Sequence, residues 1–183
     1  MEWKATAGES FPTEDDKEII VFASYFERRF NIPTDDFFRG LLHYYQLKLV
    51  HLVSNSIVVV SSFIHLCEVH LGIPPHFNLW RYFFQVKKMG KSKVVGSVGF
   101  SQRLSLKPKY IDVELPDSTS GWKSKWFYIG NQKPELPKHI GHGPVKVSEC
   151  DLHLTSREQE EVDLLLADLE GLNGAGLTGV LWR

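Results

Sequence analysis

The longest uncharged run of the chain, Leu49–Cys67, spans nineteen residues and constrains the fold more than any other segment. Its length would suit a membrane helix, but Ser54 or Asn55 can cap a new helix in its middle. Apolar residues then recur on two faces of that helix. One face carries Ile57, Val60, Ile64, Cys67 and Leu71, and the other carries Val59, Phe63 and Leu66. This pattern predicts a buried helix at the centre of a soluble bundle, ended by Gly72 and by Pro74.

Shorter helices are predicted on both sides of this central one. Thr34 is placed to cap a helix with an apolar stripe over 37–45, and Asn78 to cap a short helix over 79–84. Near the start, Thr13 precedes three acidic residues, which favours a helix that continues through Phe30. A short strand at Ile19–Phe22 is the competing interpretation, because this run is β-prone.

The periodicity changes after residue 90. Val94–Phe100, Tyr110–Leu115 and Trp122–Ile129 alternate in the manner of strands, which predicts an antiparallel β-meander packed on the helical bundle. Thr155 and Glu158 form a capping box for an amphipathic helix that ends at Gly171. The expected fold is therefore α+β, with a domain over 13–137, a linker over 138–154, and a C-terminal helix and tail over 155–183 that docks on the same domain.

Charge is distributed unevenly along the chain. Residues 87–133 hold ten Lys or Arg and three acids, a net of +7, whereas residues 149–170 hold eight acids and one Arg, a net of −7. Either the two segments neutralise each other or one faces a charged partner. Cys67 and Cys150 are the two cysteines, and the N-terminus is polar rather than signal-like. We therefore expect free thiols and a cytoplasmic or nuclear location.

Three stretches of the sequence share a pattern with a known family: FERRFNIPTDDFFRGLLHYYQLKL (Phe26–Leu49), NSIVVVSSFIHLCEVHLGIPPHFNLWRYFFQVK (Asn55–Lys87) and YIDVELPDSTSGWKSKWFYI (Tyr110–Ile129). On these residues the chain resembles the plant gypsy-type transposon domain family. The chain departs from the family pattern at Arg28–Phe30, where the family has a glycine-containing turn, and at Ser54, where it has a proline. The resemblance implies a plant, intracellular, transposon-derived protein, and it brings no catalytic motif with it.

Candidate chemistry in the sequence is weak. Gly90–Ser92 reads GKS but lacks the upstream glycine and strand of a phosphate loop, and Cys67 with His70 would be two ligands of an incomplete metal site. Cys150 lies near histidines in a connector that offers no preorganised base. We therefore expect no enzyme activity, no cofactor and no metal.

Binding is the remaining class of function. Trp122, Trp126 and Tyr128 interleave with Lys123 and Lys125, as in a surface that stacks on bases and neutralises phosphates, although a strand with solvated lysines gives the same pattern. The C-terminal helix offers Leu165 and Leu169 for a helix contact, within a homodimer for example. The leading hypothesis is a non-catalytic protein-interaction domain, an adaptor or a sequestering inhibitor, with no membrane partner. The alternative is a gag-like or DNA-associated nucleic-acid binder that uses residues 87–133.

Overall fold

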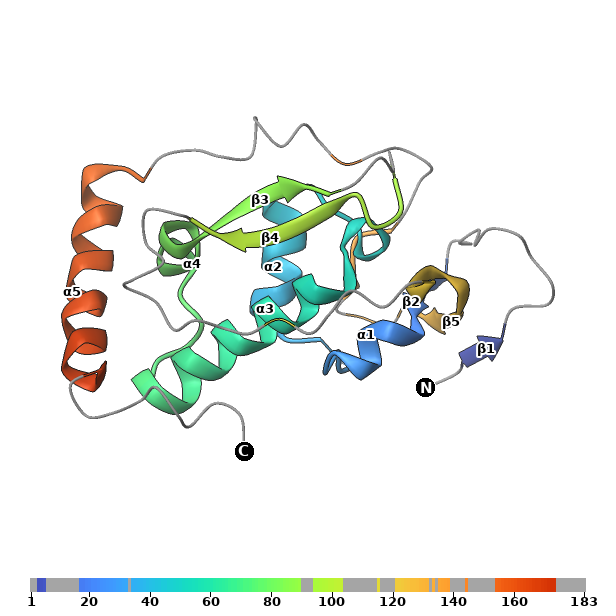
Figure 1. Cartoon of the computed structure of the whole chain (residues 1–183), viewed down its shortest axis with the longest axis horizontal. Coiled ribbons are helices and arrows are strands. Elements are labelled where there is room, and N and C mark those ends of the chain that lie inside the picture. Colours follow the sequence, from blue (N-terminus) through green and yellow to red (C-terminus); the bar gives the residue numbers. More distant parts are fainter. Residues whose placement is uncertain are drawn as a thin grey trace.

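The computed structural model describes residues 3–5, 17–32, 34–89, 94–103, 115, 121–131, 133, 135–138, 144 and 154–173. Within these residues, five α-helices pack with two small antiparallel sheets (Figure 1). The α+β class that the sequence predicts is confirmed. Both the proposed helix start at Thr13 and most of the linker over 138–154 lie outside the described residues.

The central helix is the one that the uncharged run predicts. Helix α3 spans Ser54–His65 and continues without a break into the π-helix η2, Leu66–Leu71. Both of its faces are apolar, and Ile57, Val60, Phe63 and Leu66 are buried. Gly72 ends it at φ 66, in the left-handed region that favours glycine. Runs of π-helix are rare in proteins and often mark functional sites, so the end of this helix is a region of interest.

The elements before α3 correct one prediction and confirm its alternative. Residues Glu18–Phe22 form strand β2, and helix α1 begins only at Ala23 and ends at Glu27. A continuous helix through this region is therefore wrong, and the short strand is confirmed. Its apolar residues are buried on both faces. Strand β2 pairs with another strand along one edge and packs on the turn η1, Leu49–His51. Burial on both faces removes the alternation that would have marked a strand.

Two further helices complete the bundle. Helix α2 spans Asp36–Tyr44, and its N-cap is Asp35, whose side chain accepts a hydrogen bond from the backbone N–H of Phe37 at 2.7 Å. Helix α4 spans Phe77–Phe83, and here the expected cap at Asn78 is wrong. The Nδ1 atom of His76 instead accepts from the backbone N–H of Leu79 at 3.4 Å, so the helix begins two residues earlier than predicted.

The strands belong to two sheets rather than to one meander. Strand β5 (Trp126–Gly130) lies between β1 (Trp3–Ala5) and β2, with Tyr128 opposite Ile20, whereas β4 (Val98–Gln102) pairs with β3 (Phe84–Lys88). Within the described residues, the predicted meander of neighbouring strands is therefore wrong. Alternation of apolar and polar residues indicates a strand, but it does not indicate which strand it pairs with. All but the last residue of the predicted strand Tyr110–Leu115 lie outside the described part.

Trp80 of α4 lies where the helices meet the β3–β4 sheet and is fully buried. Its ring stacks on Phe84 with centroids 4.4 Å apart and meets Phe100 and Phe63 edge-on at 5.1 and 5.3 Å. These contacts join α3, α4 and the second sheet into one hydrophobic core.

Helix α5 (Ser156–Asn173) lies beside α4 in Figure 1. The predicted capping box is present: the Thr155 backbone N–H donates to Glu158 Oε2 at 2.7 Å, and the Glu158 N–H donates to Thr155 Oγ1 at 3.3 Å. Val162 on the inner face is fully buried, whereas Leu164 on the outer face is 74% exposed. The helix therefore docks on the domain through one apolar face.

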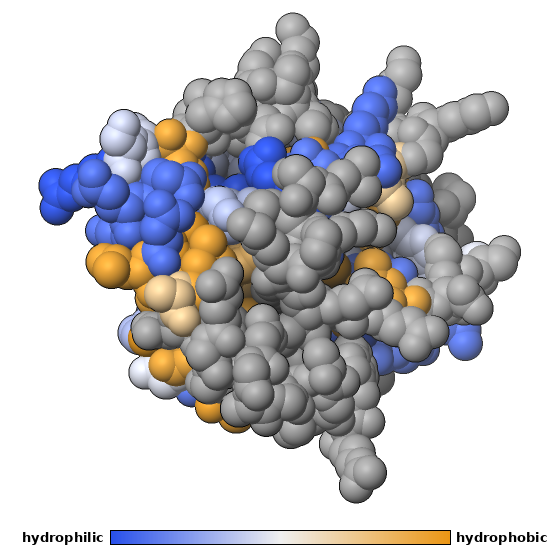
Figure 2. Space-filling model, turned by 60° about the vertical axis from the view of Figure 1, so that its left-hand side comes forward, coloured by the Kyte–Doolittle hydropathy of each residue, from blue (hydrophilic) through white to orange (hydrophobic). Residues whose placement is uncertain are grey.

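The described surface carries apolar side chains in several places. On the face shown in Figure 2, apolar patches are bordered by hydrophilic side chains. The exposed large hydrophobic residues come from different elements: Phe26, Tyr44, Val69, Met89, Leu115 and Leu164. Among the described residues, no helix has the length and hydropathy that crossing a membrane requires.

Candidate functional site

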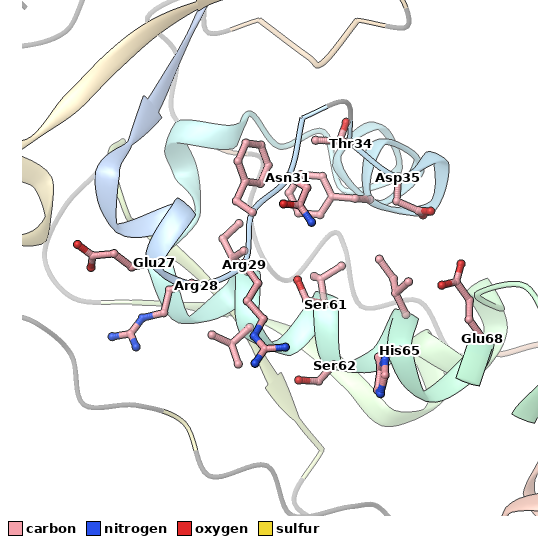
Figure 3. Close-up of a pocket in the computed structure, with 16 residues that line it drawn as sticks. Glu27, Arg28, Arg29, Asn31, Thr34, Asp35, Ser61, Ser62, His65 and Glu68 are labelled. Atoms are coloured by element: carbon pink, nitrogen blue, oxygen red, sulfur yellow. The ribbon is translucent and has the colours of Figure 1, made fainter. Parts of the chain in front are cut away.

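A pocket of about 400 Å³ lies between the α1–α2 connection and helix α3. One wall is formed by residues 27–31, Thr34, Asp35 and Phe38, and the other by side chains of α3 and η2 from Ile57 to Glu68. Figure 3 shows the two walls facing each other across the opening. We call this feature the α1–α3 groove.

The floor of the groove is apolar and continuous with the core. Phe30 and Phe38 are buried with their rings 5.8 Å apart, and Ile57 and Val60 of α3 are almost fully buried below the opening. Ile64 is partly exposed at its edge. Because the floor residues also pack in the core, the groove is held in a fixed shape and can accept an apolar side chain.

Arginines border the groove where α1 ends. Arg29 adopts φ 67, and the Phe30 backbone N–H closes the turn by donating to the oxygen of Tyr25 at 2.9 Å. This left-handed position is one that glycine fills at least cost, and it lies within Arg28–Phe30, where the sequence lacks the glycine of the family turn. In Figure 3 the Arg29 side chain extends toward α3, whereas those of Glu27 and Arg28 point away from the opening.

Carboxylates border the other end. Asp35 is fixed there because it caps α2, and Glu68 is exposed on the π-helix η2. Their carboxylates point toward one another in Figure 3. Asp36 does not belong to this pair, because it forms an ion pair with Arg39. Beyond the two carboxylates, a second hollow is lined by Phe37, Gly72, Ile73, Pro74 and Pro75.

The α3 wall supplies the uncharged polar groups. Ser61, Ser62 and His65 line the groove from one helix, so their side chains lie within one turn of each other. In Figure 3 the Ser61 side chain points toward the α2 side of the opening. The groove therefore combines an apolar floor, hydrogen-bonding groups along one wall and opposite charges at its two ends.

Some of the aromatic and lysine residues predicted for binding instead make contacts within the folded chain. Tyr128 is 4% exposed and belongs to the core. Trp122 packs edge-on against Phe22 with centroids 5.1 Å apart, and Lys123 lies over the Trp122 ring. The Lys123 Nζ atom donates to the backbone oxygen of Val95 at 2.7 Å, and desolvation by burial lowers the pKa of this amine.

Trp126 and Lys125 complete the predicted aromatic and basic set. Trp126 is partly buried on β5, whereas Lys125 is exposed beside it. These two residues are brought together with Trp122 near the first sheet, but they lie apart from the α1–α3 groove. Their role in binding a partner stays a prediction.

The C-terminal helix residues lie at an intramolecular contact. Leu165 is partly buried against the core, next to the buried Val162, and the side chain of Leu169 lies outside the described residues. A partner-binding role for Leu165 and Leu169 therefore stays a prediction too.

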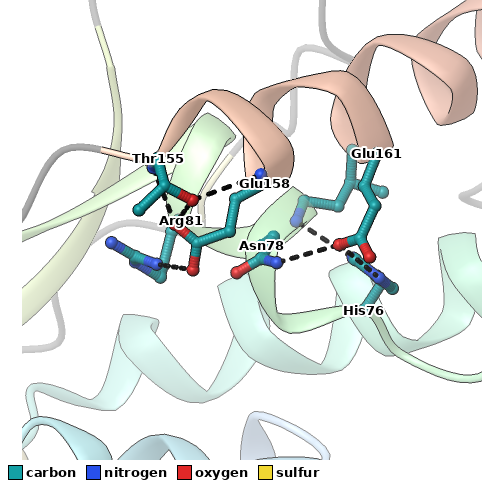
Figure 4. A network of polar contacts seen from close by, with 7 residues as sticks. His76, Asn78, Arg81, Thr155, Glu158 and Glu161 are labelled. Atoms are coloured by element: carbon teal, nitrogen blue, oxygen red, sulfur yellow. Dashed lines mark hydrogen bonds and ion pairs between the residues drawn. The ribbon is translucent and has the colours of Figure 1, made fainter.

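Polar contacts fix α5 on α4, as Figure 4 shows. Arg81 Nη1 donates to Glu158 Oε1 at 3.0 Å, and Asn78 Nδ2 donates to Glu161 Oε2 at 3.1 Å, where His76 Nε2 also approaches to 3.9 Å. The bond from the Thr155 backbone N–H, together with those from the Thr155 hydroxyl and Arg81, lowers the pKa of the Glu158 carboxyl. Both carboxylates are thus held by groups of the docked face.

The structure does not support a nucleophile or a metal ligand at Cys67. Cys67 is buried in the core, and desolvation raises the pKa of its thiol to about 11, so it carries its proton at neutral pH and is a poor nucleophile or metal ligand. In the part of the chain that the structure describes, no three His, Cys, Asp or Glu side chains gather as a metal site would require. The segment Gly90–Ser92, the His70 side chain and Cys150 with its neighbouring histidines lie outside that part.

The α1–α3 groove was not predicted from the sequence. Its walls come from residues 27–38 and 57–68, and only the packing of α2 beside α3 brings them together. A local signal existed for each end: the departure from a glycine turn at Arg28–Phe30, and the capping acids after Thr34. Neither signal indicates that the two ends face the same hollow.

Comparison with known proteins gives one match. The model of the family described as "Putative gypsy type transposon" matches residues 19–88, which run from β2 to the end of β3 and include both walls of the groove. No curated protein and no solved structure matches the chain. The sequence resemblance extended further, to Ile129, and the residues after 88 lie outside the match. Residues 19–88 are therefore similar to the gypsy-type transposon family, as the sequence resemblance predicted, and a plant origin stays a prediction.

Proposed function

We propose that the protein is a non-catalytic interaction domain that binds a peptide segment of a partner protein in the α1–α3 groove. The observation that carries this proposal is the combination of an apolar floor at Phe38 and Ile57 with polar and charged side chains along the rim. Grooves of this type take an apolar anchor from an extended or helical segment and fix its register through polar contacts at the edge.

A polypeptide fits the geometry better than a small molecule does. The groove continues past Asp35 and Glu68 into the second hollow near Ile73 and Pro74, so an occupant can follow the surface through both. By binding such a segment the domain would act as an adaptor or as an inhibitor that sequesters its target. An intracellular setting belongs to this proposal, because the thiol of Cys67 is free and buried.

Nucleic-acid binding through residues 87–133 has less support. Lys123, one of the lysines in that segment, already uses its ammonium group in a hydrogen bond to the backbone of Val95. We expect labelled single- and double-stranded oligonucleotides to bind weakly, and to be released as the salt concentration approaches ~150 mM. Submicromolar binding at that salt concentration would favour the nucleic-acid function instead.

The peptide proposal is tested by blocking the groove. Short random peptides displayed on phage would be selected against the wild type and then measured against Ser61→Phe, which places a ring in the opening without changing its charge. The matched control is His43→Phe, an exposed position of α2 that does not line the groove. Selected peptides should bind the wild type and the control equally and lose at least about tenfold in affinity for Ser61→Phe. Equal binding to all three proteins would contradict the proposal.

A further inference from the structure

Helix α5 presents an exposed leucine among acidic side chains. Leu164 is 74% exposed on the side of the helix that faces away from the domain, whereas Val162 on the inner side is fully buried. Glu160 and Glu161 precede Leu164 by four and three residues, so they lie beside it on the helix surface, and Asp163 is its neighbour in the chain. The outer face of α5 therefore offers one apolar side chain bordered by negative charge.

The charge on this face is not neutralised by other elements of the domain. The carboxylate of Glu160 is exposed and has no ion pair or hydrogen bond within the part of the chain that the structure describes. Asp163 accepts a hydrogen bond at 2.9 Å from Gln159 of the same helix, an uncharged group that leaves its negative charge in place. Arg157 is exposed on α5 too, but it lies seven residues from Leu164, roughly 10 Å along the helix axis.

The end of the β3–β4 hairpin has the opposite character. Met89 follows β3 and is 37% exposed, and its backbone N–H donates to the Ser97 oxygen at 2.8 Å, which continues the pairing of the two strands. Lys87 and Lys88 precede it and are exposed, and neither has an ion pair among the described residues. Residues two apart along a strand point to the same face, so Lys87 shares a face with Met89. This end of the hairpin is thus an apolar side chain bordered by positive charge.

The two surfaces do not meet within one molecule. In Figure 1, β3 points away from α5, which lies beside α4. The ion pairs of α5 go to Arg81 and His76 on the α4 side, and among the described residues none of them involves a lysine of the basic segment 87–133. The charges of −7 and +7 in the sequence are therefore open to a partner rather than paired with each other in the described structure.

We propose that the protein associates with a second copy of itself, with the outer face of α5 in one molecule on the end of the β3–β4 hairpin in the next. Leu164 contacts Met89, and Glu160 and Asp163 face Lys87 and Lys88. A second copy is the partner that fits, because this chain itself carries the surface that complements each face in charge and in apolar centre. The contact joins two different surfaces, so molecules add head to tail. This inference does not depend on the α1–α3 groove.

Sedimentation velocity of the full chain is the first test. The contact is small and open to solvent, so the association should be weak and sensitive to salt. The average mass should rise as the protein is concentrated from ~10 to ~500 µM in ~20 mM salt, and return to that of the monomer in ~0.5 M salt. A chain that stays monomeric throughout the low-salt series would overturn the proposal, and so would an association that salt does not change.

Two charge-reversed variants then identify the surfaces. Glu160→Lys/Asp163→Lys makes both surfaces positive, and Lys87→Glu/Lys88→Glu makes both negative. Each variant alone should remain monomeric in low salt, because like charges meet at every contact. An equimolar mixture of the two should associate at least about tenfold more tightly than either alone, since opposite charges then face each other. A mixture that does not associate would contradict the pairing of these two surfaces.

The matched control is Glu27→Lys/Glu68→Lys. It changes the net charge by the same amount as Glu160→Lys/Asp163→Lys, at two exposed acids that line the groove and belong to neither surface. This variant should associate as the wild type does. If it abolishes association as completely as the α5 variant does, net charge alone governs the effect and the proposal is wrong.

Folding and nucleic acid are checked in the same samples. All substituted side chains are exposed, and the melting temperature of each variant should match that of the wild type. Leu164→Ser removes the apolar centre of the acidic face without changing charge, and it should weaken the association of a chain that still folds. If the association of the wild type disappears after nuclease treatment, Lys87 and Lys88 bind nucleic acid rather than α5, and the proposal is overturned.

Discussion

The hydroxyl group of Tyr25 donates to the backbone oxygen of Leu52 at 2.8 Å, across a separation of 27 residues. The same hydroxyl lies 3.1 Å from the oxygen of Leu49. These contacts join helix α1 to the turn that precedes α3, the helix whose side chains line the facing wall of the groove. Burial raises the pKa of Tyr25 well above its usual value, so the hydroxyl keeps the proton that it donates.

Replacing Tyr25 with Phe should lower the free energy of unfolding by roughly 1–3 kcal/mol, because buried carbonyl oxygens would lose their donor. Tyr82→Phe, at a partly buried tyrosine of α4, serves as the control and should change the free energy of unfolding by less than about 0.5 kcal/mol. Urea denaturation measures the free energy of unfolding of both variants. Equal effects would show that the Tyr25 bond does not join the two elements as described.

Two helices end in a left-handed residue that is not glycine. Arg29 and Gln46 have φ 67 and φ 50, and each is followed by an N–H that closes the turn: Phe30 to Tyr25 at 2.9 Å and Leu47 to Leu42 at 2.8 Å. Glycine at either position removes strain of about 1–2 kcal/mol but adds freedom to the unfolded chain. Both Arg29→Gly and Gln46→Gly should therefore leave stability unchanged or raise it by up to about 1 kcal/mol.

Thermal and urea denaturation of the two glycine variants, with Arg29→Val as the opposite case, check this prediction. A β-branched residue fits the left-handed region poorly, so Arg29→Val should lower the free energy of unfolding by at least about 1 kcal/mol. A stable valine variant together with a destabilised glycine variant would contradict the turn geometry.

Local signals predicted the helix ends at Thr155 and Gly72 correctly, but they put the N-caps of α2, α3 and α4 at Thr34, at Ser54 or Asn55, and at Asn78. The structure has Asp35, Val53 and His76 at these positions. The capping box of Thr155 and Glu158 and the glycine stop at Gly72 were read correctly, because each depends on a few neighbouring residues. The helix expected through Ile19 and Phe22 was wrong, because burial on both faces of β2 comes from strands and turns that lie far along the sequence. The cap of α4 was assigned to Asn78, since histidine is not a usual capping residue.

Tertiary packing decided the rest. Lys123 looked like a solvated lysine, and only the approach of Val95 and Trp122 turns it into a hydrogen-bonded residue of the fold. The groove needs Phe38 of α2 and Ile57 of α3 to line the same hollow, an arrangement that no local pattern in either segment indicates. The pairing of the strands could not be predicted from the sequence either, because β4 and β5 alternate in the same way but join different sheets.

Helix α5 should dock through Val162. Val162→Asp places an unpaired carboxylate in a fully buried position, whereas Leu164→Asp changes a residue of the same helix that is 74% exposed. The first variant should undock the helix, bind a hydrophobic dye and lower the melting temperature, and the second should behave as the wild type does. If the two variants melt alike without dye binding, α5 does not contribute to the core.

Stability should fall in alkaline solution, partly because of Cys67. Burial raises the pKa of this thiol from its usual 9.0 to about 11, so folding favours the protonated form. Below pH 9 the contribution is fully present, and between pH 9 and about 11 the unfolded chain releases the proton while the folded chain retains it. The free energy of unfolding should therefore decrease with rising pH across this window, and more steeply in the wild type than in Cys67→Ala. Parallel curves would contradict the burial of the thiol.

The most direct test of the groove as a binding site is the position of a bound peptide on the folded chain. Methyl NMR spectra of isoleucine- and valine-labelled protein would be recorded while a selected peptide is added. The account predicts shifts at Ile57, Val60 and Ile64, which line the groove, and unchanged signals from Val86, Val98 and Val162, which do not. Shifts centred on Val162, with the groove methyls unaffected, would contradict it and place the partner on helix α5 instead.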